Sequence, residues 1–247
     1  MVCLLKRFGN MFLSNVDIVA ICDNPKQLLD LAVKTTENKD FVFDKENANK
    51  IKGLGLSQLM NIKLSTIEIR DSFLTALSSN YPVNFFHALD SIDALIYLMP
   101  DLTLGKHVGK NDFHDENVYP HLLRCLEVST EFTNDPYLRL AILTHDIAKP
   151  HTIARKNDKV TFHKHEVIGA SLIYKWMENL HFPRKKILYV SKLVRHHQFY
   201  FQNDTTDATL VKWLHTVGKD WKDLFILRMV DRAGNIKKMH EGKNLIT

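Results

Sequence analysis

Residues 138–150 read LRLAILTHDIAKP and carry the strongest structural pattern in the chain. Its first six positions are mostly apolar and predict a buried helix, which ends on the polar pair His145-Asp146. Neighbouring side chains on a helix point about 100° apart, so this pair can bind one ion only where other ligands face it. The stretch therefore predicts a helical core with a ligand pair at one helix end.

Further candidate ligands lie on other predicted helices in the second half of the chain. They are His121, His165, His196, His197 and Asp231. Bundle cores assemble metal sites in this way, with one or two ligands from each helix. Taken singly, each histidine is equally explained as a surface residue or a hydrogen-bonded core residue, so the prediction rests on the whole set.

Helical spacing continues on both sides of this stretch. Apolar residues predict helices over 117–132, 136–149, 165–180, 184–200, 207–216 and 219–238, with a short strand or turn at Lys159–His163. Three more helices are predicted towards the N-terminus. The first follows Pro25, and the second follows a capping-box pattern formed by Ser65 and Glu68. The third covers Phe85 to Leu98 and ends before Pro100. Alternating strand patterns are nearly absent. The expected fold class is all-α, a helical bundle preceded by a smaller helical region.

Composition excludes several classes of protein. The 247 residues are 45% hydrophobic and 25% charged, which excludes a disordered or low-complexity chain. No run approaches the roughly 20 apolar residues of a membrane span, and the N-terminus does not read as a signal peptide. We therefore expect a cytoplasmic protein without a membrane partner. Cys3, Cys22 and Cys125 are read as ordinary reduced thiols.

Charge and histidine are distributed unevenly along the chain. The first 105 residues hold 10 basic and 12 acidic side chains, whereas the remainder holds 23 and 16, with 12 of the 13 histidines. The stretch Thr103–Lys106 is the best candidate boundary, which predicts domains at 1–105 and 106–247. A positive second half suits a nucleotide or RNA phosphate partner, and a solvated basic surface explains it equally well.

Three phrases carry a resemblance to a known family. They are Asn117-Val118-Tyr119-Pro120-His121, Leu143-Thr144-His145-Asp146-Ile147-Ala148-Lys149-Pro150 and Phe162-His163-Lys164-His165-Glu166. In this order, together with Asp231, they resemble the HD-domain metal-dependent phosphohydrolases. The match is closest to the neck and C-terminal HD domain of bacterial tRNA nucleotidyltransferases. The Asp-x-Asp pair of that family's nucleotidyltransferase head is not found, so the resemblance implies a neck and HD domain without the head, and nucleotide addition is not expected.

The resemblance implies a role for each candidate residue. Its pattern makes His121, His145, Asp146 and Asp231 ligands of one divalent cation, with His165 and His197 completing a second site that Asp146 bridges. The metal would be Mn, Fe, Co, Ni or Zn, as one or two ions. Asp146 and Lys149 are the catalytic candidates, although Lys149 could instead serve the helix dipole. The candidate substrate contacts are Lys149, His114, His196, Arg195 and Arg232, with Arg155, Lys156 and Lys164 near the mouth.

Three functions remain open at this point. The first is a metal-dependent phosphohydrolase, either a phosphomonoesterase or a 2′,3′-cyclic phosphodiesterase, acting on a nucleotide or an RNA terminal phosphate. The second is a tRNA- or RNA-binding module with a structural metal. The third is a partner of a separate nucleotidyltransferase subunit. The sequence fixes neither the natural substrate nor the metal nor the oligomeric state, because one fold serves many specificities.

Overall fold

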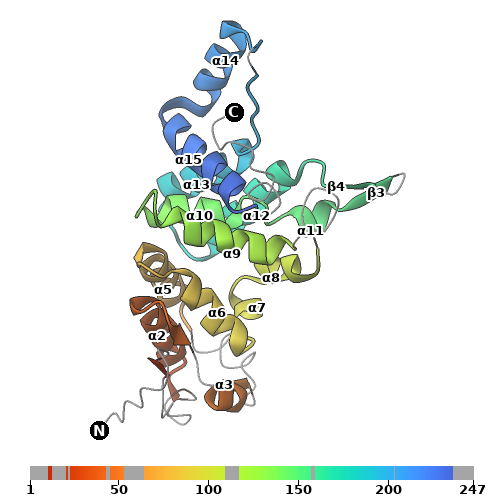
Figure 1. Ribbon diagram of the computed structural model, residues 1–247. Helices are drawn as coiled ribbons and strands as arrows, with labels where there is room; N and C mark the ends of the chain where they lie inside the picture. The colour runs from red at the N-terminus through yellow and green to blue at the C-terminus, as the bar shows by residue number, and fades with distance from the viewer. Residues whose placement is uncertain are drawn as a thin grey trace. The chain divides into compact units, whose positions relative to one another are not determined.

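The computed structural model describes residues 11–12, 21, 23–42, 45–52, 64–108, 117–156, 159–202 and 204–235. The chain divides into two compact units, Met1–Thr103 and Leu104–Thr247. In both units the described residues are mainly helical (Figure 1), which confirms the predicted all-α class. None of the described helices is long and apolar enough to cross a membrane.

The first unit has a small aromatic core between short helices. Its elements are β1 (Met11–Phe12), α2 (Lys26–Lys34), η1 (Thr35–Glu37), β2 (Phe41–Val42), α3 (Lys45–Lys52), α5 (Thr66–Ser78), α6 (Val83–Ser91) and α7 (Leu95–Leu98), and α8 (Pro100–Leu104) crosses the boundary. The strands β1 and β2 pair in parallel. Phe73 of α5 meets Phe85 and Phe86 of α6 edge to face, at ring-centroid distances of 5.2 and 5.8 Å. These buried rings join α5 to α6.

The predicted capping box at the start of α5 is present. The Ser65 hydroxyl accepts a hydrogen bond from the Glu68 backbone N–H at 3.2 Å, and the Glu68 carboxylate accepts one from the Ser65 backbone N–H at 3.0 Å. The bond from the Ser65 backbone N–H lowers the pKa of Glu68 most, followed by one that the Ser65 hydroxyl donates to the same carboxylate at 2.9 Å, because both favour its charged form. Two amides that the helix itself leaves unpaired are satisfied in this way.

The single helix predicted from Phe85 to Leu98 is wrong, because the chain breaks between α6 and α7. Asp93 adopts a left-handed backbone conformation with φ of 58°, and the Ala94 N–H donates to the Leu89 carbonyl at 2.8 Å. This is the hydrogen-bond pattern of a helix C-terminus, and Asp tolerates the left-handed region better than most residues. The apolar spacing continues across the break, which is why the sequence pattern concealed it.

The second unit contains the predicted bundle. Its elements are η2 (Gly105–His107), α9 (Val118–Ser129), α10 (Pro136–Thr144), α11 (Lys149–Thr152), β3 (Ala154–Lys156), β4 (Lys159–Thr161), α12 (His165–Asn179), α13 (Arg184–His196), α14 (Asp207–Val217), η3 (Gly218–Asp220) and α15 (Trp221–Ala233). Helix α10 packs against α9, α13 and α15, and α12 pairs with α13 (Figure 1). Gly169 lets α12 approach α13 closely, since a Cβ there would lie 3.3 Å from Val194 Cγ1. The pair β3–β4 is an antiparallel hairpin, so Lys159–Thr161 is a strand.

Four helices of this unit end several residues earlier than predicted: the one predicted over 117–132 stops at Ser129, the one over 219–238 stops at Ala233, and two more stop beside a histidine. The helix predicted over 136–149 stops at Thr144, a turn covers 145–148, and α11 starts at Lys149. Pro150 explains the break, because in a continuous helix its ring would clash with the Asp146 carbonyl and its missing N–H would leave a gap. The helix predicted over 184–200 stops at His196. Both ends place a histidine where the regular backbone hydrogen bonds run out.

Candidate metal centre

Six side chains converge at the helix ends of the second unit. They are His121 from α9, His145 and Asp146 from the turn after α10, His165 at the start of α12, His197 directly after α13, and Asp231 from α15. All are buried except Asp231, which is partly buried. Each of these helices therefore contributes through an end or an inward face, as a ligand set in a bundle requires.

Four ligand atoms form a first group. Asp231 Oδ1 lies 3.3 Å from His121 Nε2 and 3.5 Å from His145 Nε2. Asp146 Oδ2 lies 3.3 Å from His145 Nε2 and 3.9 Å from His121 Nε2. Ligand atoms bound about 2.1 Å from one ion are themselves about 3 to 4 Å apart, so this spacing could hold a single cation.

A second group shares Asp146 with the first. The other carboxylate oxygen, Asp146 Oδ1, lies 3.0 Å from His165 Nε2 and 3.6 Å from His197 Nε2. One oxygen of Asp146 thus faces the first group and the other faces the second. This arrangement allows one carboxylate to bridge two cations.

Backbone carbonyls orient three of the four histidines. The Nδ1 atom of His145 lies 2.8 Å from the Ile142 carbonyl oxygen, that of His165 lies 2.6 Å from Phe162, and that of His197 lies 2.7 Å from Val194. A carbonyl oxygen only accepts, so each Nδ1 carries the proton and donates it. In the neutral ring the lone pair then lies on Nε2, the atom that faces the carboxylates.

The Nε2 atom of His145 is the clearest sign that the group suits a cation. It is buried, and within the described residues it has no hydrogen-bond partner, because its short contacts to Asp146 and Asp231 lack hydrogen-bond geometry. Leaving a buried polar atom unpaired costs about 1–3 kcal/mol. Imidazole and carboxylate without thiolate are the ligands of borderline divalent ions, so a transition metal fits these residues.

Lys149 belongs to the same group of side chains. Its ammonium lies 2.6 Å from Asp146 Oδ2 and 5.6 Å from the centre of the Phe162 ring, and it is 7% exposed. Lys149 is the first residue of α11 and Asp146 lies in the turn before it, so the two side chains meet although no continuous helix joins them. A buried ammonium beside a carboxylate is a strong local source of positive charge.

The pKa values show that the two carboxylates attract positive charge. Burial alone would raise the pKa of Asp146, but Lys149 and His145 lower it well below the usual range. Burial likewise opposes the lowering of the Asp231 pKa, which the neighbouring imidazoles of His121 and His145 bring about. Burial lowers the pKa of His145, and Asp146 and Asp231 outweigh that effect and raise it to about 10. In the metal-free chain a proton on His145 therefore supplies charge that a cation would otherwise supply.

His197 behaves differently from His145. Burial lowers the pKa of His197, and its contact with Asp146 offsets this only in part. His197 is therefore neutral at physiological pH, which is the form in which imidazole binds metals.

Several of the predicted substrate contacts lie elsewhere. His196 and Arg195 are outside the group of six and line a separate groove along α13, and Arg195 lies 3.8 Å from Glu166. Burial, followed by Arg195 and Lys192, lowers the pKa of His196. Arg232 is partly buried directly after Asp231, and Arg155 and Lys164 are exposed. His114 and the side chain of Lys156 lie outside the described residues.

Three residues that contact the candidate ligands were not predicted from the sequence. Arg228 Nη1 donates to Asp231 Oδ2 at 3.1 Å, Gln198 Nε2 lies 3.3 Å from His165 Nε2, and Cys125 Sγ lies 3.6 Å from His121 Nε2. Arg228 and Cys125 are spaced three and four residues from a candidate ligand on one helix, which was a usable signal. Gln198 follows His197 in a segment without regular secondary structure, where residue spacing does not predict which way a side chain points.

Comparison with known families agrees with this geometry. Residues 118–217 match the model of the HD domain, and they contain five of the six converging side chains. This part of the chain is therefore similar to an HD domain. HD domains are commonly metal-dependent hydrolases that bind divalent metals, and the predicted resemblance is confirmed at this level.

Curated relatives share part of this chain. It is 28% identical to an A-adding tRNA nucleotidyltransferase of Deinococcus radiodurans over 168 residues, which is 66% of this chain and 38% of the relative. It is 26% identical to a multifunctional CCA protein of Nitrosococcus oceani and 29% identical to one of Legionella pneumophila, each over 145 residues, 58% of this chain and 35% of the relative. The chain thus spans little more than a third of the length of these relatives.

Proposed function

We propose that the HD domain is a metal-dependent phosphohydrolase that acts on a nucleotide or an RNA terminal phosphate, as a phosphomonoesterase or a 2′,3′-cyclic phosphodiesterase. One observation carries the proposal: the two oxygens of Asp146 face two separate pairs of imidazole Nε2 atoms. Asp146 would bridge two ions, with His121, His145 and Asp231 as ligands of the first and His165 and His197 as ligands of the second. The names of the curated relatives favour an RNA substrate.

The residues of the chain would have distinct tasks in this reaction. The carbonyls of Ile142, Phe162 and Val194 hold the imidazoles with their Nε2 lone pairs facing inward. Divalent ions bound there would supply an activated water and neutralise phosphoryl charge. The buried ammonium of Lys149 would offset negative charge on a phosphate oxygen, since it lies beside Asp146 at the same centre.

The discriminating experiment is a phosphoester panel with Mn²⁺-loaded protein. The panel holds p-nitrophenyl phosphate, bis-p-nitrophenyl phosphate, 2′,3′-cyclic AMP, and RNA ending in a 2′,3′-cyclic or a 3′-phosphate. We expect turnover of at least one RNA or nucleotide substrate, lowered more than about 100-fold in Asp146→Asn, because loss of a ligand should exceed the 10- to 100-fold effect of its supporting partners.

A structural metal predicts a different outcome. In that case the loaded protein would bind RNA and hydrolyse none of these compounds. Equal activity in the wild type and in Asp146→Asn would also refute the proposal. The exposed Lys212→Ala variant on α14 is the matched control and should retain full activity.

A further inference from the structure

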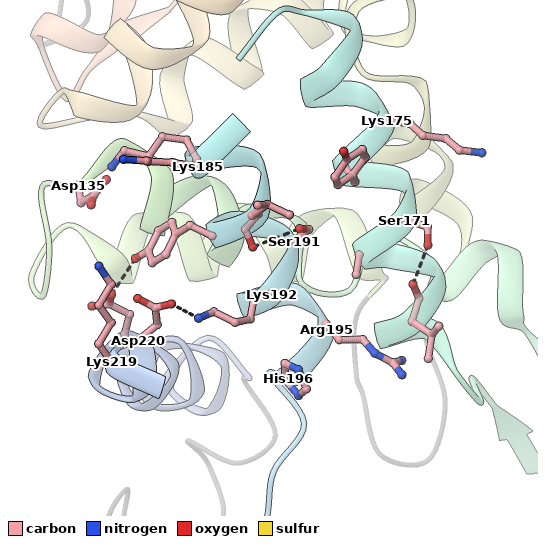
Figure 2. A pocket seen from close by; sticks show the side chains of 17 residues that line it. Asp135, Ser171, Lys175, Lys185, Ser191, Lys192, Arg195, His196, Lys219 and Asp220 are labelled. Atoms are coloured by element: carbon pink, nitrogen blue, oxygen red, sulfur yellow. Dashed lines mark hydrogen bonds and ion pairs between the residues drawn. The ribbon is translucent and has the colours of Figure 1, made fainter. Parts of the chain in front are cut away.

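A broad groove runs along α13 on the surface of the second unit. It has a volume of about 1150 Å³, and α12, α13, η3 and the start of α15 supply most of its lining (Figure 2). None of the six converging side chains lines it. The groove is therefore a feature separate from the candidate metal centre.

The acidic groups in the groove are engaged by their neighbours. Asp135 accepts a hydrogen bond from the Tyr137 backbone N–H, Asp220 pairs with Lys192, and Asp223 accepts one from the Tyr189 hydroxyl at 2.8 Å. The last two contacts are drawn in Figure 2. Of the three carboxylates only Asp220 is neutralised by a cation, but the six lysine and arginine side chains of the lining outnumber the three carboxylates, so the groove keeps a net positive charge.

Several cations of the groove are not engaged in this way. Lys185 and Lys219 are exposed, and neither has an ion pair or a hydrogen-bond partner for its ammonium within the described part of the chain. Arg195 is exposed and has only the long contact of 3.8 Å to Glu166. The groove thus offers a surplus of positive charge to a ligand.

The cations are spaced along the groove rather than gathered at one point. Lys185 and Arg195 are ten residues apart on α13, about 15 Å along the helix axis at about 1.5 Å per residue. One strand of a duplex carries a phosphate about every 3.4 Å of axis, so several phosphates fit this length. Leu188, 49% exposed, and Tyr174 give the groove apolar surface between the charges, suited to sugars and bases.

At one end of the groove, a residue of its lining is directly followed in sequence by a residue of the candidate metal centre. His196 lines the groove and the next residue, His197, belongs to the converging group. Arg195 contacts Glu166, and the residue before it, His165, is also in that group. A strand lying along α13 would therefore have one end close to the centre.

We propose that this groove binds the phosphodiester backbone of a single RNA strand and guides the end of that strand towards the metal centre. The inference rests on the proposed function for its choice of substrate. RNA is favoured over an acidic polypeptide because the charges extend over several phosphate spacings with apolar surface between them.

The test is RNA binding by the full-length, Mn²⁺-loaded protein, followed by fluorescence anisotropy. The probe is a labelled 20-nucleotide single strand with hydroxyl groups at both ends, which offers no terminal phosphate to hydrolyse. We expect Lys185→Glu/Lys219→Glu to weaken binding at least tenfold and to reduce its salt dependence. The control Lys34→Glu/Lys212→Glu changes the net charge equally at exposed lysines outside the groove and should bind as the wild type does.

Hydrolysis of p-nitrophenyl phosphate in the same samples separates this inference from the proposed function. Both double variants should keep wild-type turnover, and Lys185→Arg/Lys219→Arg should keep RNA affinity. No RNA binding by the wild type, an equal loss in the control, or competition by polyglutamate as strong as by RNA would overturn the groove proposal. RNA binding through the groove without turnover of any phosphoester would instead refute the proposed function alone.

Discussion

Asp146 and Lys149 form the closest charged pair of the candidate metal centre, with 2.6 Å between Nζ and Oδ2. The ammonium occupies space beside the same oxygen that faces His121 and His145. In the metal-free protein, Lys149 and protonated His145 therefore stabilise buried Asp146, and protonated His145 and Arg228 stabilise partly buried Asp231.

Replacing Lys149 with Met should destabilise the metal-free protein. The change leaves Asp146 buried with less compensating charge, which costs about 1–3 kcal/mol or more. Urea unfolding in EDTA should show this loss, and added Mn²⁺ should reduce it, since the ions then neutralise Asp146. An equal loss with and without Mn²⁺, or none in EDTA, would show that Lys149 is not coupled to this centre. Lys212→Met, at an exposed site, is the control.

The pKa of His145 makes the metal-free protein sensitive to alkali. Its folded pKa of about 10 exceeds the ordinary 6.5, so the contribution is complete below pH 6.5 and is lost as the pH rises towards 10. The lowered pKa values of Asp146 and Asp231 act at the acid end instead, where their contribution is lost below pH 3.8. Between pH 6.5 and 10 the free energy of unfolding should fall by at most about 1.4 kcal/mol per pH unit.

Urea unfolding in EDTA at pH 7, 8 and 9 measures this slope. His145→Gln should flatten it, because the titrating group is gone. A wild-type protein of constant stability over this range, or a variant with the same slope, would contradict the assignment to His145.

At the level of elements, the packing of α9 against α15 brings His121 and Asp231 together. Gly234 directly follows α15, and a Cβ there would lie 2.5 Å from Cys125 Sγ on α9. Gly234→Ala should therefore push the two helices apart and cost about 1–3 kcal/mol, the usual penalty of overpacking.

A double-mutant cycle with Cys125→Ala isolates that contact. Removing Sγ makes room for the new methyl group, so Gly234→Ala should cost less in the Cys125→Ala background than alone. Thermal unfolding of the four proteins measures the coupling. Additive effects would mean that α9 and α15 do not meet closely at these residues.

The helices that carry the candidate ligands were predicted from the sequence more accurately than the residues at which those helices end. The candidate ligands His121, His145-Asp146, His165, His196 or His197, and Asp231 could be placed on predicted helices, and the choice of His197 came from the resemblance to the HD-domain family. The breaks after Thr144 and at Asp93 could not be read from apolar spacing, which continues across both. The hydrogen bonds from Nδ1 to the carbonyls three residues earlier depend on those helix ends, so the direction of each imidazole was also beyond the sequence.

Over the whole molecule, two sites hold part of the positive charge of the second half. Part of it, Lys149, lies inside the candidate metal centre, and part lies in the groove along α13. Net charge alone could not distinguish the lysines at these two sites from lysines on an ordinary solvated surface. The distinction came from partners: Lys149 and Lys192 pair with carboxylates, whereas Lys185 and Lys219 face solvent.

We propose that the six converging side chains hold two divalent ions bridged by Asp146. Titration of metal-free protein with Mn²⁺, with the free ion counted by electron paramagnetic resonance, measures how many ions the chain binds. We predict two bound ions per chain in the wild type, one in His165→Ala/His197→Ala, and none held tightly in Asp146→Asn. A wild-type protein that binds no Mn²⁺, or an Asp146→Asn variant that binds as many ions as tightly, would contradict the claim.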